Sequence, residues 1–311
     1  MNALEQLKTM TTIVADTGDL QAIARLKPVD ATTNPSLITK ALTHPDKQAM
    51  LADTLSRFSG DIDAVIDDLT IQVGCDILAL IEGRVSTEVD ARLSYDTEAT
   101  ITKAHEFIEA YAKAGVDTQR ILIKIAATWQ GIEAAKQLEK QGIHCNLTLL
   151  FGQHQAVACA DAGVTLISPF VGRILDWQKR EQDRQDIDVS EDLGVQSVKR
   201  TYQYYKQHGY QTQVMGASFR STAQILALAG CDLLTISPNL LDELSTITDP
   251  VVQQLSADMT CEPMKKVSLD AQAFSNAYEQ DSITQALLPK GIDGFIQARE
   301  ELAQALRALS R

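Results

Sequence analysis

The sequence lacks paired cysteines and has a deficit of positive charge. Its five cysteines are odd in number, widely spaced and free of any Cys-x-x-Cys pair, so neither a disulfide framework nor a zinc cluster is expected. This usage of cysteine predicts a reducing, cytoplasmic environment. Lys and Arg number 28 against 41 Asp and Glu, and the formal charge of -13 argues against a nucleic-acid-binding face. An anionic small molecule can still bind where a few arginines gather in one cleft.

Three further absences narrow the function. No stretch approaches the roughly 20 apolar residues of a membrane span, and residues 1–8 hold no signal-peptide core, so a soluble protein without membrane partners is predicted. No Gly-x-Gly-x-x-Gly follows a strand, so a nicotinamide cofactor is not expected, nor is any other cofactor. The histidines do not stand at predicted strand ends with the spacing of metal ligands, so no metal site is predicted. These histidines are His44, His105, His144, His154 and His208.

The pattern of hydrophobic residues predicts the fold. The 311 residues, 45% of them hydrophobic, can bury one large core or two smaller ones. Short β-branched runs alternate with segments of helical spacing, which is typical of a parallel sheet with crossover helices. Eight runs predict strands over residues 11–14, 29–32, 85–89, 121–125, 145–149, 166–169, 213–216 and 233–237. Eight β/α units favour a closed α/β (β/α)8 TIM barrel, and without internal repeats residues 1–311 are predicted to be one domain.

Helical spacing fills the intervals between most of the predicted strands. The clearest amphipathic helices are predicted over residues 97–114, 131–141, 152–162, 195–208 and 221–229. The gap between residues 36 and 83 has room for two or three extra helices after the second strand. Residues 176–194 are dense in charges of both signs, which predicts a solvated loop or helix. From residue 238 onward the tail is predicted to be helical, ending in an amphipathic helix over residues 294–309.

A lysine interrupts one apolar strand, Ile121-Leu-Ile-Lys-Ile-Ala-Ala127. Burying an ammonium ion is costly unless the site uses or neutralises the charge. A low dielectric favours the free amine, and a free amine attacks carbonyl groups, so Lys124 is a candidate for Schiff-base chemistry. The structural alternative is a lysine whose ammonium reaches solvent at the strand end.

Polar residues stand at the carboxyl ends of the first seven predicted strands, where the active site of such a barrel lies. They are Asp16, Thr32, Asn34, Glu88, Lys124, Asn146, Thr148, Ser168 and Ser218. Side chains alternate along a strand, so the two polar residues of the second strand share one face, as do those of the fifth. Asp16 and Glu88 are the carboxylates of this set, which suits general acid/base catalysis. For Glu88 the alternative is an ordinary ion pair with Arg84 or Arg92.

Two arginines follow the sixth and seventh strands. Arg173 ends the segment Ser168-Pro-Phe-Val-Gly-Arg173, and Arg220 follows Ser218 by two residues. Loops after the later strands of a barrel often hold phosphate, and two guanidinium groups can bind it through bidentate hydrogen bonds. With Ser218 they favour a phosphorylated substrate, the alternative being solvent-exposed loop arginines.

Several of these segments resemble one known family. Asp30-Ala-Thr-Thr-Asn-Pro-Ser-Leu-Ile38 resembles the first signature of transaldolases, and Ile121-Leu-Ile-Lys-Ile-Ala-Ala-Thr-Trp-Gln-Gly131 resembles the segment around the Schiff-base lysine of that family. Further similar blocks follow in the same order over residues 14–19, 86–96, 146–151, 167–177 and 215–220. The resemblance covers residues 9 to about 245 and indicates the classical bacterial type, whereas the tail after residue 249 looks less typical.

The resemblance implies a class I aldolase mechanism in the non-oxidative pentose phosphate pathway. Lys124 would attack the ketone of sedoheptulose 7-phosphate or fructose 6-phosphate. Glu88, through a water held with Thr148, would shuttle protons while the imine forms. Asp16 would take the hydroxyl proton as the carbon-carbon bond breaks, and the dihydroxyacetone unit left on Lys124 would pass to an aldose phosphate acceptor.

The resemblance also implies a set of substrate-binding residues. Asn34, Asn146 and Ser168 would hold the hydroxyls of the three-carbon unit, Arg173, Ser218 and Arg220 the phosphate, with Thr32 and Phe170 completing the set. Sugar phosphates are the expected partners, and a homodimer is left open. Two other functions stay open, a simple aldolase that releases dihydroxyacetone and a non-catalytic sugar-phosphate-binding protein. Loss of a catalytic residue would mark the second, and all of them are present.

Overall fold

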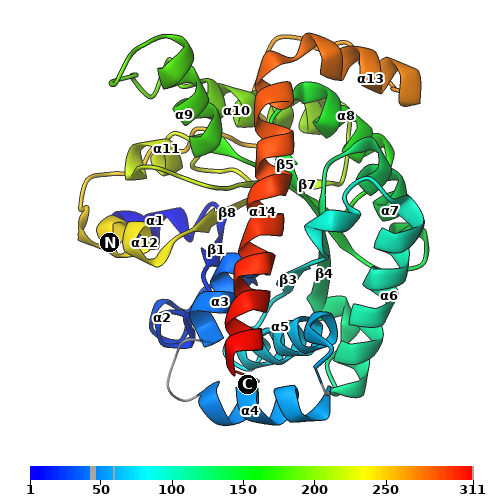
Figure 1. Cartoon of the computed structure of the whole chain (residues 1–311). Coiled ribbons are helices and arrows are strands. Elements are labelled where there is room, and N and C mark those ends of the chain that lie inside the picture. Colours follow the sequence, from blue (N-terminus) through cyan, green and yellow to red (C-terminus); the bar gives the residue numbers. More distant parts are fainter. Residues whose placement is uncertain (43–46, 59, 310–311) are drawn as a thin grey trace.

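A computed structural model describes residues 1–42, 47–58 and 60–309. Its centre is a closed barrel of parallel strands in the order β1 to β8 (Figure 1). The strands are β1 (Thr12–Asp16), β2 (Asp30–Thr32), β3 (Val85–Glu88), β4 (Ile121–Ala126), β5 (Cys145–Leu150), β6 (Leu166–Pro169), β7 (Gln213–Gly216) and β8 (Leu233–Ile236). The predicted TIM barrel is confirmed, and each predicted strand lies within two residues of an observed one.

Helices follow the strands and cover the outside of the barrel. They are α1 (Ala3–Leu7), α2 (Leu20–Leu26), α3 (Pro35–Leu42), α4 (Gln48–Arg57), α5 (Ile62–Leu78), α6 (Thr97–Lys113), α7 (Trp129–Lys140), α8 (Gln153–Asp161), α9 (Val171–Glu181), α10 (Leu193–Gln207), α11 (Thr222–Leu226), α12 (Pro238–Thr246), α13 (Ala271–Gln280) and α14 (Ser282–Leu309). Aspartates begin many of them: Asp19, Asp61, Asp96, Asp192 and Asp270 each accept a hydrogen bond from the first helical turn. None of the described helices is long and apolar enough to cross a membrane.

The barrel interior is layered, and this layering places the polar residues. A small apolar cluster, the interior plug, fills the middle of the barrel; it consists of Val14, Leu122, Leu166, Met215 and Leu233. Two residues further along four of these strands come Asp16, Lys124, Ser168 and Thr235. Because side chains two apart on a strand share a face, four of the five apolar residues are each followed by a polar one at the carboxyl end, and Met215 is followed by Ala217. The plug therefore forms the floor of a polar cavity.

The extra segments follow the prediction in part. Three helices, α3, α4 and α5, occupy the gap after β2, and residues 176–194 begin in α9 and continue as largely exposed turns, both as predicted. The tail is not helical throughout, because residues 247–270 contain no helix. Pro250 and the β-branched residues around it disfavour a helix, and the backbone N–H of Leu255 instead bonds to the Ala229 carbonyl.

The last helix is longer than predicted and lies over the barrel. It begins at Ser282, well before the predicted residue 294, and continues through Pro289. Figure 1 shows α14, in red, running lengthwise across the strands from α13 toward α3 and α4. Its buried face includes Leu288, Ile292 and Phe295, which pack with residues of the loops after β5 and β6. The tail thus contributes to the end of the barrel where the predicted active site lies.

Candidate active site

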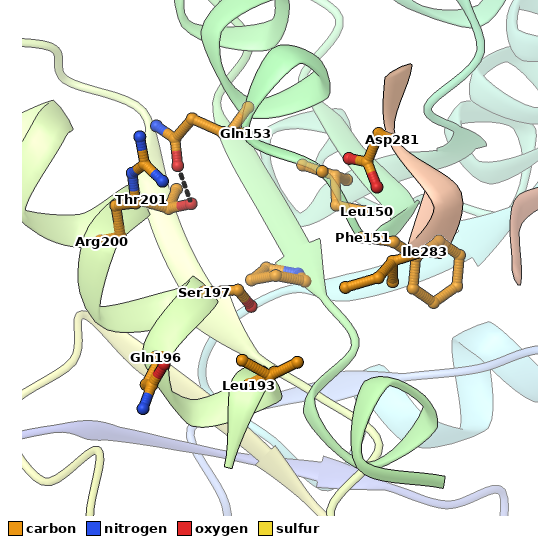
Figure 2. A pocket seen from close by; sticks show the side chains of 13 residues that line it. Leu150, Phe151, Gln153, Leu193, Gln196, Ser197, Arg200, Thr201, Asp281 and Ile283 are labelled. Carbon is orange, nitrogen blue, oxygen red and sulfur yellow. Dashed lines mark hydrogen bonds between the residues drawn. The ribbon is translucent and has the colours of Figure 1, made fainter. Parts of the chain in front are cut away.

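Two cavities of similar size lie near the carboxyl ends of the strands. One, of about 270 Å³, opens above the interior plug and contains Lys124. The other, of about 300 Å³, lies between the start of α8, α10 and the junction of α13 with α14 (Figure 2). Figure 2 shows Gln153 and Arg200 on one side of it and Asp281 and Ile283 on the other. Its lining contains no lysine, whereas the first cavity contains Lys124, the lysine predicted to form the Schiff base.

The cavity over the plug gathers nearly all the predicted site residues. Its lining residues are Asp16, Thr32, Asn34, Lys124, Thr148, Ser168, Phe170, Arg173, Ala217, Ser218, Phe219, Arg220, Thr235, Ser237 and Phe295. Each of the two predicted residues outside this lining contacts a residue of the lining. Glu88 contacts Lys124, and Asn146 accepts a hydrogen bond from Ser168. Residues from all eight strands and their loops therefore meet at one place.

Sequence reasoning missed five of these lining residues, for different reasons. Thr235 and Ser237 stand two apart at the end of the eighth strand, a signal as clear as those used for the second and fifth strands. Ala217 and Phe219 flank Ser218 and carry no polar mark. Phe295 comes from α14, and no local pattern distinguishes it from the other apolar residues of that helix.

Lys124 is held in a buried ion pair. Its Nζ lies 2.9 Å from Glu88 Oε2 and donates a hydrogen bond of 3.1 Å to the Thr33 carbonyl oxygen. The Lys124 and Glu88 side chains are only 6% and 5% exposed, so the ammonium does not reach solvent at the strand end. The approach to Oε2 is close enough for an ion pair but is not directional enough for a hydrogen bond. β3 and β4 create this contact because Glu88 and Lys124 are register partners.

The alternative ion pairs of Glu88 are wrong. Arg84 pairs with Asp30 at 2.9 Å at the other end of the barrel. Arg92 pairs with Asp90 and Asp63 outside the cavity. Lys124 is therefore the cationic partner of Glu88.

Burial raises the pKa of both active-site carboxyls. For Glu88, desolvation is the largest influence, and it outweighs the opposing effects of Lys124 and Arg173. For Asp16, desolvation again outweighs the attraction of Lys124 and the hydrogen bond from Thr32. A carboxyl whose pKa is raised keeps its proton to a higher pH than a solvated carboxyl does, which suits general acid/base catalysis. The two environments differ, since only Glu88 contacts Lys124 directly.

Hydrogen bonds fix the neutral polar groups of the cavity. Asn146 donates from Nδ2 to Ser86 at 3.0 Å and accepts at Oδ1 from Ser168 at 2.6 Å. Thr32 Oγ1 donates to Asp16 Oδ1 at 3.0 Å. The Oγ1 atom of Thr148 is buried and has no hydrogen-bond partner among the described residues. A buried hydroxyl of this kind is costly unless a ligand or a water completes it.

Two arginines form the cationic side of the cavity. Gly172 allows the loops after β6 and β7 to meet, because a Cβ there would lie 2.2 Å from the Ser218 carbonyl oxygen. Arg220 donates to Asp176 at 2.8 and 3.1 Å and to Ser218 Oγ at 3.3 Å. Arg173 contacts no carboxylate in the described part of the chain and lies 4.9 Å from the centroid of the Phe170 ring. Burial and the neighbouring Arg220 lower the pKa of Arg173, and the more distant carboxylates of Glu88 and Asp176 oppose this shift.

Metal ligands do not gather in the described residues. No group of three or more His, Cys, Asp or Glu side chains there is arranged to hold a metal ion, and His44 lies outside the described residues. The five cysteines carry free thiols.

Comparison with known proteins identifies the family. The family model described as Transaldolase/Fructose-6-phosphate aldolase matches residues 13–306, which includes the tail that looked less typical. The protein named Transaldolase from Acidobacterium capsulatum is 54% identical over 97% of this chain and 94% of its own. The proteins of that name from Nostoc sp. and Methylococcus capsulatus are 54% and 52% identical, over 98% of this chain and 95% and 96% of theirs. The chain belongs to the transaldolase/fructose-6-phosphate aldolase family.

Proposed function

We propose that this protein is a transaldolase that moves a dihydroxyacetone unit from sedoheptulose 7-phosphate or fructose 6-phosphate to an aldose phosphate. The observation that carries the proposal is the buried pair of Lys124 and Glu88, 2.9 Å apart, on the floor of a cavity with two arginines at its rim. An amine, a proton acceptor and a phosphate-binding group are what a Schiff-base reaction on a sugar phosphate requires. The names of the relatives support the same activity.

Formation of the imine is assigned to Lys124 and Glu88. The Lys124 amine attacks the ketone carbon of the donor, and the resulting carbinolamine loses its hydroxyl as water. Glu88 supplies and removes the protons of these steps, because its carboxyl touches Nζ and its pKa is raised by burial. Thr148 assists by holding a water beside Glu88, which accounts for its buried and unpartnered hydroxyl.

Cleavage of the carbon-carbon bond is assigned to Asp16. The carboxylate takes the proton from the donor hydroxyl next to that bond, the aldose phosphate leaves, and the electron pair is delocalised into the iminium to give an enamine on Lys124. The attraction of Lys124 and the hydrogen bond from Thr32 favour the ionised form of Asp16 and oppose the effect of burial. The acceptor aldehyde then retraces these steps in reverse.

The remaining residues bind the substrate. Asn34, Asn146 and Ser168 bind the hydroxyls of the three-carbon unit, and Thr32 and Phe170 shape its surroundings. Arg173, Arg220 and Ser218 bind the phosphate at the opposite side of the cavity. Since Arg220 is paired with Asp176, a phosphate bound to Arg220 shares the guanidinium with that carboxylate or displaces it.

Borohydride trapping tests the proposal. Reduction in the presence of fructose 6-phosphate should inactivate the protein and attach one reduced dihydroxyacetone unit to Lys124, as read by peptide mass spectrometry. Lys124→Arg should be inactive and unlabelled, because a guanidinium stays protonated and cannot attack a ketone. Lys136→Arg, at an exposed site on α7, is the matched control and should retain labelling. An adduct on another lysine, or none in the unmodified protein, would overturn the assignment.

A further inference from the structure

One face of α14 carries three residues four apart that all reach the active-site end of the barrel. They are Gly291, Phe295 and Arg299. Residues four apart lie one above the other on a helix, so these three form a single stripe. Each contacts a different part of the site or of its surroundings. The stripe therefore determines how the helix lies over the cavity.

Gly291 lets the helix approach the cavity wall closely. A Cβ at this position would lie 2.7 Å from Leu149 Cδ2 and 3.2 Å from Arg173 Nη1. Contacts this short would force Leu149, Arg173 or the helix itself to shift. The absence of a side chain thus brings the next turn of α14 directly over Lys124.

Phe295 occupies that next turn. Its side chain lines the cavity and is 7% exposed. The ring centroid lies 5.7 Å from Lys124 Nζ and 5.6 Å from Arg173 Cζ. The ring therefore contacts both the proposed Schiff-base nitrogen and one proposed phosphate-binding arginine, at distances typical of cation–π contacts. In this position the Phe295 ring covers Lys124 Nζ, which water would otherwise reach from the mouth of the cavity.

Arg299 anchors the helix on the far side of Phe295. Its guanidinium lies 3.0 Å from carboxylate oxygens of Asp63, Asp67 and Asp90, and its side chain is 10% exposed. Asp63 and Asp67 belong to α5, and Asp90 follows Glu88 by two residues. Removing one partner of a buried ion pair is strongly destabilising, so loss of the Arg299 cation would leave Asp67 and Asp90 with an uncompensated charge. The anchor thus joins α14 to the end of β3 that carries Glu88.

We propose that Phe295 is a specificity-determining residue that keeps water from the enamine on Lys124, and that Arg299 positions it. This inference rests on the proposed function. If water enters, the enamine carbon takes up a proton to give an iminium, water adds to the iminium carbon, and the C–N bond breaks. The products are free dihydroxyacetone and the Lys124 amine, so one water is consumed and the unit is lost from transfer. Phe295 sets the balance between transfer and hydrolysis by excluding that water.

The test compares Phe295→Leu with Phe274→Leu. Phe274 is a buried aromatic on α13 that packs on Trp129 and His154, away from the cavity. Release of dihydroxyacetone and transfer to erythrose 4-phosphate are measured in the same reaction. Phe295→Leu should raise the ratio of release to transfer by roughly five- to thirtyfold, because a leucine covers the enamine less completely and admits water. Phe274→Leu should leave the ratio unchanged.

Arg299→Gln gives a second, independent arm. It should raise the same ratio by a smaller factor and increase hydrogen exchange of α14, whereas Arg299→Lys should restore part of both. A ratio unchanged in Phe295→Leu, with borohydride labelling of Lys124 intact, would overturn the role of Phe295 and leave the proposed function standing. Absence of labelling in the unmodified protein would instead overturn the proposed function. A ratio unchanged in Arg299→Gln while α14 exchanges faster would overturn the anchoring role.

Discussion

Replacing Arg173 by methionine should lower kcat/KM for fructose 6-phosphate by about 10- to 150-fold, the equivalent of the roughly 1.5 to 3 kcal/mol of a charge-assisted hydrogen bond. Methionine keeps the apolar stem that packs on Phe170 and removes the charge. Arg173 has no carboxylate partner in the described structure, and burial lowers its pKa, so a phosphate that binds it displaces no competing anion. Its full contribution is therefore available to the substrate.

The same replacement at Arg220 should cost less, about 3- to 30-fold. The Arg220 side chain is 41% exposed and already pairs with Asp176, so part of its interaction with phosphate replaces an existing ion pair of roughly 0.2 to 1 kcal/mol. The assay compares kcat/KM for the donor fructose 6-phosphate with kcat/KM for the donor dihydroxyacetone, which carries no phosphate. Both variants should lose little on the free donor. Equal losses on both donors would mean that the arginines are structural, and a larger loss at Arg220 than at Arg173 would refute the reasoning from burial.

Two further predictions concern Asp16. Asp16→Asn should still form the imine but lack the cleavage base, so rapid-quench mass spectrometry after borohydride should find the intact donor on Lys124; Glu88→Gln should instead show little adduct at early times, since losing a proton carrier costs about 10²- to 10⁴-fold in rate. A three-carbon adduct in Asp16→Asn would remove that carboxylate from the cleavage step. Because burial raises the pKa of Asp16, the native chain binds more protons than the unfolded chain between the two pKa values, and its stability falls as pH rises through this window. Urea unfolding should therefore find Asp16→Asn more stable than the unmodified protein at pH 8 by roughly 0.5 to 2 kcal/mol, with the difference vanishing at a pH below the unfolded value of about 3.9; a difference that does not depend on pH would contradict this account.

Local patterns in the sequence predicted most of the barrel. Strands such as β4 and β5 are rich in apolar residues because both of their faces are buried, and this composition can be recognised without knowing the neighbouring strands. The polar residues at strand ends were equally visible, since alternation along a strand decides which side chains face the interior. The eighth strand also has a polar pair at its carboxyl end, Thr235 and Ser237, which the prediction did not use.

The partners of those residues were not visible in the sequence. Glu88 and Lys124 are separated by a whole β/α unit in the sequence, whereas Arg84 and Arg92 are closer to Glu88 along the chain. Glu88 pairs with Lys124 because the two residues are register partners on β3 and β4. The extended course of residues 247–270 likewise depends on contacts with distant segments, such as the Ala229 carbonyl.

By itself, then, the sequence determined the barrel, the end of the barrel where the candidate site lies, and the types of residue found there. It did so because hydrophobic periodicity depends only on residues that are close together in the chain. Only the tertiary structure decided that Lys124 pairs with Glu88, that Arg173 is left without a carboxylate in the described chain while Arg220 is paired, and that Phe295 reaches Lys124 from the last helix. These contacts join residues far apart in the chain. Their geometry depends on strand register and on how closely the helices pack, for example where Gly291 has no Cβ to hold α14 away from Leu149. No local sequence pattern encodes the register or the packing distance.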